Sequence, residues 1–94
     1  MEEELSPLAR EIISRLVFEE VYENIVDELN HANPYEVADE VKTLIARDIV
    51  KPCRDLQNGK TSGFIYDSDH MTDYSFTLTA KGMGLLETLL KDSR

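Results

Sequence analysis

Three polar side chains share one face of a helix that the sequence predicts over residues 34 to about 47. They are Asp39, Lys42 and Thr43, and they lie opposite the apolar residues of the same helix. In a DNA major groove, Lys42 could donate to a guanine or a phosphate, Thr43 to a base edge, and Asp39 could accept from a cytosine amino group. The alternative is a solvent-exposed helix face whose mixed charges serve only to keep it hydrated.

A second candidate group consists of the cations Lys51, Arg54 and Lys60, which Asp55 interrupts. Three cations on a predicted strand and the turn after it suit contact with a phosphate backbone. Lysines also protect an exposed strand edge from pairing with other chains. The sequence leaves these two interpretations equally open.

Metal binding and catalysis are not expected. Cys53, His31 and His70 could ligate a metal, but their spacing matches no zinc pattern. The chain has no nucleophile motif and no glycine-rich phosphate loop. We therefore predict no enzyme activity, no metal and no cofactor.

The charge balance restricts the partners. Nineteen acidic residues against ten basic ones give a net charge of −9. Because affinity for nucleic acid normally rests on Lys and Arg, this balance counts against strong non-specific DNA binding. It leaves room for a local basic face, and its simplest alternative meaning is solubility.

The composition indicates one folded domain over residues 1–94, with 41% hydrophobic and 31% charged residues. No apolar run approaches the roughly 20 residues that span a membrane. A single cysteine, Cys53, excludes an internal disulfide, and the first residues are acidic, unlike a secretory signal. We expect a cytoplasmic protein.

Four helices are predicted from apolar periodicity and capping signals, over residues 7–18, 21–30, 34–47 and 80–91. Ser6, Asn33 and Thr79 are the expected N-caps, with Pro7 and Pro34 at first helical positions. The junction between the first two helices lacks Gly or Pro, so one bent helix is the alternative. Residues 1–5 and 92–94 are expected to fray.

Strands and turns are predicted between the third and the last helix. Pro52 suits an edge strand over residues 49–52, and Asn58-Gly59 is a hairpin signal. Aromatic and β-branched residues predict a second strand over residues 63–66. Residues 74–79 alternate, with Tyr74, Phe76 and Leu78 on one face, and form the third strand. The expected fold class is therefore α+β.

Two stretches carry a family resemblance. Residues 44–50, Leu-Ile-Ala-Arg-Asp-Ile-Val, lead from the third helix into the first strand, and residues 74–82, Tyr-Ser-Phe-Thr-Leu-Thr-Ala-Lys-Gly, lead from the last strand into the last helix. In this order and spacing the chain resembles the winged-helix family of helix-turn-helix proteins, including MarR- and PadR-type regulators. The resemblance implies three helices, a β-hairpin or three-stranded wing, and a C-terminal helix.

The resemblance also implies a transcriptional regulator that binds duplex DNA through the third helix and the wing. The candidate contact residues are Tyr35, Asp39, Lys42, Thr43, Arg47, Lys51, Arg54 and Lys60. The runner-up function on the same fold is an acidic protein-interaction module, such as an antirepressor, a DNA mimic or an assembly subunit. Its partner would be a basic protein, bound by acidic residues at Glu19, Glu20, Glu23, Asp27, Glu28, Glu36, Asp39 and Glu40.

The terminal helices carry more apolar surface than one small core needs. This excess predicts a homodimer, with an interface that includes Ile13, Leu16, Leu86, Leu89 and Leu90. The alternative is that the first and last helices only pack on each other.

Overall fold

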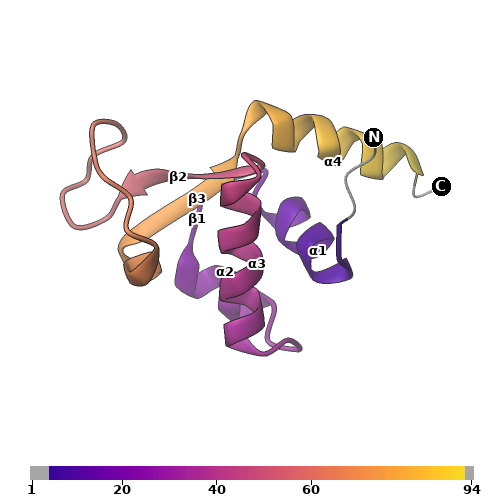
Figure 1. Ribbon diagram of the computed structural model, residues 1–94, viewed down its shortest axis with the longest axis horizontal. Helices are drawn as coiled ribbons and strands as arrows, with labels where there is room; N and C mark the ends of the chain where they lie inside the picture. Colours follow the sequence, from indigo (N-terminus) through magenta and orange to yellow (C-terminus); the bar gives the residue numbers. More distant parts are fainter. Residues whose placement is uncertain (1–4, 93–94) are drawn as a thin grey trace.

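The computed structural model describes residues 5–92. Over these residues the chain is mixed α+β, with five helices and a three-stranded antiparallel sheet (Figure 1). The elements, in chain order, are α1 (Pro7–Arg15), β1 (Glu20–Val21), α2 (Tyr22–Glu28), α3 (Pro34–Ala46), β2 (Val50–Asp55), the 3-10 helix η1 (Ser68–Asp73), β3 (Tyr74–Leu78) and α4 (Ala80–Asp92). The α+β class predicted from the sequence is confirmed.

The predicted helix starts are confirmed by their capping hydrogen bonds. The Ser6 side chain accepts from the Ala9 amide at 3.0 Å, and the Asn33 side chain accepts from the Tyr35 amide at 2.8 Å. The Thr79 hydroxyl accepts from the Gly82 amide at 3.0 Å. Each side chain satisfies a backbone donor that has no partner within its helix, which fixes where the helix begins.

The first predicted helix is too long, because α1 ends at Arg15 and not at residue 18. At this end the Leu16 carbonyl accepts from the Leu78 amide and from the Thr77 hydroxyl, both at 3.0 Å. These bonds tie the end of α1 to β3 instead of to a further helical turn. The alternative of one bent helix is also wrong, since a short strand separates α1 from α2.

The sheet has the order β1-β3-β2, and β3 is its central strand. Glu20 and Val21 pair with Phe76 and Ser75, and β2 pairs with the other edge of β3. The predicted strand over residues 63–66 is wrong. Both edges of β3 are already occupied, and Gly63 has a positive φ of 71° that interrupts an extended segment.

Aromatic packing replaces the missing strand pairing. Phe64 and Tyr66 lie over Tyr74, with ring centroids 5.8 and 5.1 Å away, and Tyr66 also contacts Phe76 edge-on at 6.1 Å. The Tyr74 hydroxyl donates to the Ile65 carbonyl and accepts from the Asp67 amide, both at 3.0 Å. Backbone bonds also hold the chain between β2 and η1: the Leu56 amide donates to the Asp73 carbonyl at 2.9 Å, and an isolated bridge joins Asp55 to Lys60.

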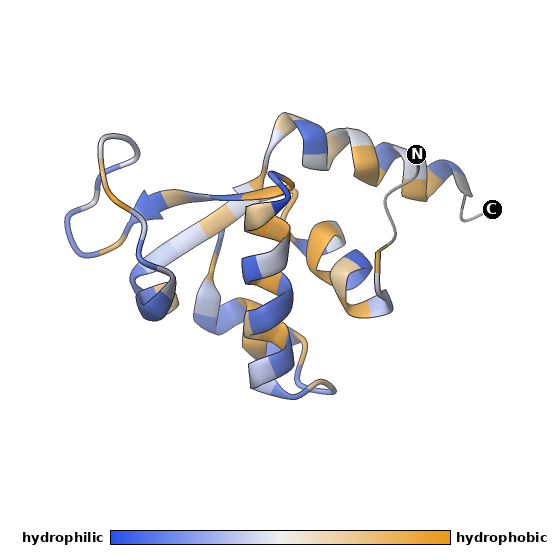
Figure 2. Ribbon diagram, viewed as in Figure 1, coloured by the Kyte–Doolittle hydropathy of each residue, from blue (hydrophilic) through white to orange (hydrophobic). Residues whose placement is uncertain are grey.

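The buried core lies where α1, α2 and α3 meet the sheet, around the fully buried Phe76 of the central strand. Buried hydrophobic residues of α1 and α3 belong to this core, and both helices carry hydrophobic bands in Figure 2. Gly82 allows α4 to approach the end of α3 closely, because a Cβ atom there would overlap the Ile49 carbonyl oxygen. The same Ile49 carbonyl accepts from the Thr79 amide at 2.9 Å.

The chain ends were predicted to fray over residues 1–5 and 92–94. Residues 1–4 and 93–94 lie outside the described residues. Leu5 packs against the core, and Asp92 is the last residue of α4.

Candidate functional site

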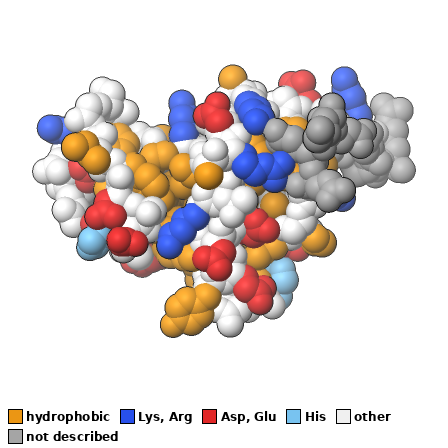
Figure 3. All heavy atoms as spheres, viewed as in Figure 1, with side chains coloured by type: hydrophobic (Ala, Val, Ile, Leu, Met, Phe, Trp, Pro, Cys, Tyr) orange, Lys and Arg blue, Asp and Glu red, His pale blue; other side chains and the backbone are white. Residues whose placement is uncertain are grey.

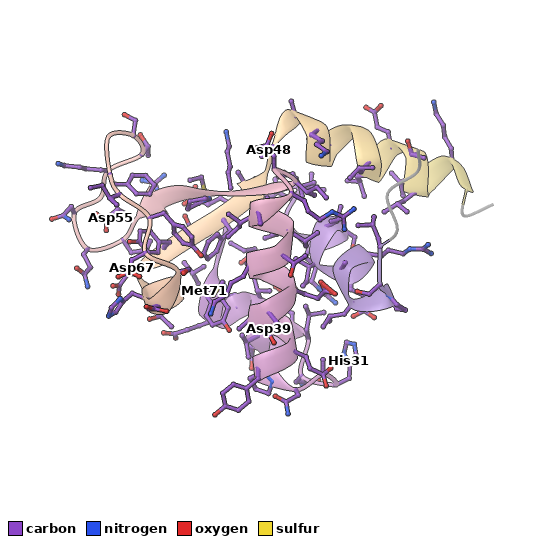
Figure 4. The ribbon with its side chains drawn as sticks, in the orientation of Figure 1. His31, Asp39, Asp48, Asp55, Asp67 and Met71 are labelled. Atoms are coloured by element: carbon purple, nitrogen blue, oxygen red, sulfur yellow. The ribbon has the colours of Figure 1, made fainter. Side chains whose placement is uncertain are left out.

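The outer face of α3 carries four of the predicted contact residues. Tyr35, Asp39, Lys42 and Thr43 are all exposed, with the Tyr35 side chain 82% accessible. Val37, Val41 and Leu44 fill the opposite, buried face. Figure 4 shows Asp39 on the side of α3 that is turned away from the sheet. The helical periodicity of the sequence therefore places these four side chains correctly.

A hollow of about 480 Å³ lies on one side of this face, between α3 and the start of α1. We call it the acidic hollow, and it is lined by Ser6, Pro7, Leu8, Glu36, Asp39, Glu40 and Thr43. The Ser6 hydroxyl donates to a Glu40 carboxylate oxygen at 2.6 Å, which fixes one wall to the other. Among the described residues that line it, three are carboxylates and none is a cation, so these residues repel phosphate and attract basic groups.

A second hollow, of about 340 Å³, lies on the other side of α3, next to η1. Lys42 and Tyr35 line it together with Tyr22 from α2 and Met71 from η1. Burial raises the pKa of the Tyr22 hydroxyl, and the nearby Asp39 carboxylate raises it further. The outer face of α3 therefore lies between the acidic hollow and a second hollow whose lining includes two tyrosines.

Arg54, expected from the sequence to contact phosphate, makes an ion pair within the chain. Its Nε and Nη2 atoms donate to the Glu19 carboxylate at 2.8 and 3.4 Å. The buried Ser75 hydroxyl donates to the same carboxylate at 2.5 Å. Donation by Arg54, followed by that of Ser75, lowers the pKa of Glu19. The Arg54 charge is thus neutralised beside the sheet.

The other predicted cations lie on β2, in the loop after it and at the end of α3. Lys51 and Lys60 are exposed, one on β2 and the other in the loop after it, where the Lys60 backbone pairs with Asp55. Arg47 is the C-cap residue of α3 and is half-buried. Its backbone carbonyl accepts from Lys81 Nζ at 3.0 Å. Figure 3 shows acidic and basic side chains interspersed over the visible face, without a continuous basic field among the described residues there.

Sequence reasoning missed Glu19 as the partner of Arg54. The two residues are far apart in the chain, and Glu19 was expected in a helical junction. They meet only because β1 pairs with β3, which brings Glu19 beside the Ser75 hydroxyl. Predicting this ion pair requires the register of the strands, which the sequence alone does not give.

The histidines and the cysteine lie apart, each beside its own partner. His31 Nε2 lies 2.8 Å from a Glu11 carboxylate oxygen, and Cys53 Sγ lies 3.4 Å from the Ser75 hydroxyl. His70 Nδ1 lies 2.8 Å from Asp67, whose carboxylate raises the pKa of the imidazole. Within the described part of the chain, no group of three or more His, Cys, Asp or Glu side chains could hold a metal ion.

Comparison of the chain with protein-family models, with curated proteins and with solved structures finds no match. Across residues 5–92, no helix combines the length and apolar character needed to cross a membrane.

Proposed function

We propose that the chain is a winged-helix regulator, of the kind that MarR- and PadR-type proteins represent, and that it binds duplex DNA. The order of elements supports this proposal, since it is compatible with a winged-helix layout in which α2 and α3 would be the helix-turn-helix and the loop between β2 and β3 the wing. The two stretches that carry the family resemblance occupy the α3–β2 and β3–α4 junctions.

The exposed outer face of α3 is the observation that carries the DNA proposal. Its 13 residues make a helix about 20 Å long, and a helix of ordinary diameter enters the 12 Å major groove. Lys42 lies centrally in this helix and is exposed, so it donates to a guanine or a phosphate there. Tyr35 and Thr43 add a second and third hydrogen-bonding group, and Asp39 accepts from an exocyclic base amine.

The wing contributes less to affinity in this proposal than the sequence suggests. Lys51 and Lys60 reach phosphates, whereas Arg54 remains bound to Glu19. With few cations available and a net charge of −9, binding depends on base contacts. Its affinity should fall only gently with salt, because few phosphates are neutralised and few counterions are released. The proposal therefore describes a selective DNA reader with weak non-specific affinity.

A salt-titrated binding assay tests the DNA proposal. Binding to a pool of random duplexes, with selection of the sequences retained, is measured upward from about 50 mM salt. Lys42→Ala should weaken the selected complex about tenfold, within the ~1–3 kcal/mol of a base contact. Lys91→Ala, which removes an exposed lysine at the far end of α4, is the matched control and should bind normally. Failure to retain any duplex at low salt would overturn the proposal.

The acidic hollow favours a second candidate function, a protein-interaction module for a basic partner. Its acidic lining residues are Glu36, Asp39 and Glu40. They belong to α3, the helix that enters the major groove under the DNA proposal. The double substitution Glu36→Lys with Asp39→Lys distinguishes the DNA proposal from the interaction proposal. It leaves Glu40 unchanged, because Glu40 is hydrogen-bonded to Ser6. Under the DNA proposal the reversal strengthens non-specific DNA binding; under the interaction proposal it abolishes binding of a basic partner.

The proposed regulator pairs as a homodimer through α4. Ile13 and Leu16, predicted in this interface, are fully buried within the chain and are corrected to core residues. Leu86 and Leu89 are half-buried, and Leu90 is 64% exposed. The dimer proposal therefore rests on α4 alone.

A further inference from the structure

A continuous furrow runs between α2, the start of α3 and η1. It consists of the 340 Å³ hollow beside Lys42 and an adjoining hollow of about 250 Å³, which share Tyr22, Pro34 and Thr72 as lining residues. We call it the aromatic furrow. Most of its lining comes from α2 and η1 and from the first turn of α3, and it lies on the opposite side of α3 from the acidic hollow.

The walls of the furrow are apolar and aromatic. Met71 is 6% exposed, and Val26 and Ala38 are half-buried. Figure 4 shows Met71 on η1, at the side that faces α2. Tyr22 lines both hollows, while Tyr35 follows Pro34 at the rim and leaves 82% of its side chain in solvent. An aromatic ring this exposed beside a proline is a ready surface for stacking.

The rim of the furrow is mainly acidic. Glu23 and Asp27 line it on α2, Asp69 lines it on η1, and Lys42 is the one cation among its described lining residues. Within the described part of the chain, Glu23 and Asp27 take part in no ion pair. Their charges are therefore available to a partner, and the net charge of −9 attracts a basic one from a distance.

We propose that the aromatic furrow docks an extended, proline-containing segment of another protein that carries arginine or lysine. Polyproline II segments bind aromatic-lined grooves, because their apolar rings and methylenes stack on tyrosine and they lose little entropy on binding. The cations of such a segment meet Glu23 and Asp27 at one end of the furrow and Asp69 at the other. This site goes beyond the DNA proposal, since α2 and η1 supply residues that no DNA contact uses.

Docking in the furrow has a consequence for the outer face of α3. Tyr35 and Lys42 belong to both surfaces, so a bound segment covers part of the face that the DNA proposal assigns to the major groove. Peptide and DNA therefore compete if both proposals hold. If DNA binding fails its own test, the furrow remains a site for the segment.

Titration of the isotope-labelled protein with a short synthetic peptide of arginine, proline and leucine tests the furrow. Backbone resonances of α2, of the first turn of α3 and of η1 should shift on binding. A peptide with glutamate in place of arginine, and one with alanine in place of proline, should each bind at least about tenfold more weakly. Absence of binding by the basic peptide, or shifts confined to other elements, overturns the proposal.

Matched variants separate docking from general charge attraction. Tyr35→Ala removes an exposed ring without disturbing the core, and Asp27→Lys reverses a rim charge; each should weaken the peptide about tenfold or more. Glu87→Lys makes the same charge change on the exposed side of α4 and should bind like the unmodified protein. Equal weakening by Glu87→Lys would show that net charge alone attracts the peptide. Asp27→Lys lies outside the DNA contact set, so its loss of peptide binding is distinct from any loss of DNA binding.

Discussion

Gly82 and Gly84 lie two residues apart in α4, yet the structure gives them different roles. A Cβ atom at Gly82 would overlap the Ile49 carbonyl oxygen, whereas a Cβ at Gly84 would meet nothing within 4 Å. The Ile49 carbonyl belongs to the junction between α3 and β2 and cannot give way as a flexible side chain can. Residue size is therefore restricted at Gly82 and unrestricted at Gly84.

This difference gives a prediction about stability. Gly82→Ala should lower the free energy of unfolding by about 1–3 kcal/mol, because the added methyl forces α4 away from Ile49. Gly84→Ala, the matched control, should raise it by up to about 1 kcal/mol, since alanine favours a helix over glycine. Urea unfolding followed by circular dichroism measures both. Equal effects of the two substitutions would contradict the close packing of α4.

The Glu19 carboxylate predicts a pH dependence of stability. Its pKa is lowered in the folded chain from the usual value of 4.5, first by Arg54 and then by Ser75. A carboxylate with a depressed pKa stabilises the fold above its unfolded pKa, and this stabilisation is lost as the pH falls through the folded pKa. Stability should therefore decrease below about pH 4.5. Because the ion pair is partly exposed, the effect is modest.

Substitution of Glu19 isolates its share of this acid sensitivity. Glu19→Gln keeps the size of the side chain and removes its titration, so the loss of stability below pH 4.5 should become shallower. Glu87→Gln, an exposed position on α4, is the matched control and should keep the original pH profile. Thermal unfolding at several pH values provides the measurement. Identical profiles for Glu19→Gln and the unmodified chain would contradict the role of the ion pair.

At the scale of elements, Asp48 joins α3 to β2 in a left-handed conformation with φ of 61°. Its amide donates to the Ile45 carbonyl at 3.0 Å, and its carbonyl accepts from the Thr79 hydroxyl at 2.5 Å. The turn is thus fixed from both sides. Aspartate tolerates this region better than most residues, but glycine adopts it without steric cost.

Substitutions at Asp48 should follow backbone preference. Asp48→Gly should change the free energy of unfolding by less than about 1 kcal/mol, because relief of strain offsets the greater freedom of the unfolded chain. Asp48→Val should lower it by about 1–3 kcal/mol, since a β-branched residue is strained at positive φ. Chemical denaturation compares the two. A harmless Asp48→Val would contradict the left-handed conformation of this junction.

The helices were predictable because their signals are local. Ser6, Asn33 and Thr79 bond to amides two or three residues away, so the sequence around each helix start contains the whole cap. The exposed face of α3 follows equally from the spacing of its buried residues. Apolar periodicity therefore sufficed to predict α3, α4 and the Tyr35–Lys42 side of the candidate site.

The strands depended on partners far along the chain and were predicted less well. β1 is two residues long and forms because β3 has a free edge, which no local pattern around Glu20 reveals. The aromatic segment after Gly63 has strand-like residues, but its rings pack on Tyr74 and its backbone does not join the sheet. The Arg54–Glu19 ion pair follows from the same register. Non-local strand pairing therefore determines that Arg54 is held in an ion pair, whereas Lys51 and Lys60 are exposed.

At the scale of the whole molecule, α4 extends from the sheet along one side of the structure (Figure 1). It has hydrophobic residues along its length in Figure 2, although only part of this surface meets α1 and the core. Met83 is 40% exposed and Leu90 is 64% exposed. Apolar side chains left in water on one helix suit burial against a second copy, which supports the proposed homodimer.

A charge on this surface of α4 should separate the two copies. Leu90→Glu places a carboxylate where the proposed interface is apolar, and the dimer should dissociate to a folded monomer of about 10.8 kDa. Thr88→Glu adds the same charge to another exposed position of α4, and its mass should stay that of the dimer. Light scattering coupled to size exclusion gives the mass, and circular dichroism checks that both variants are folded. A monomeric unmodified chain would contradict the dimer outright. Loss of the dimer in both variants would instead indicate that net repulsion at −9, and not the apolar face of α4, controls association.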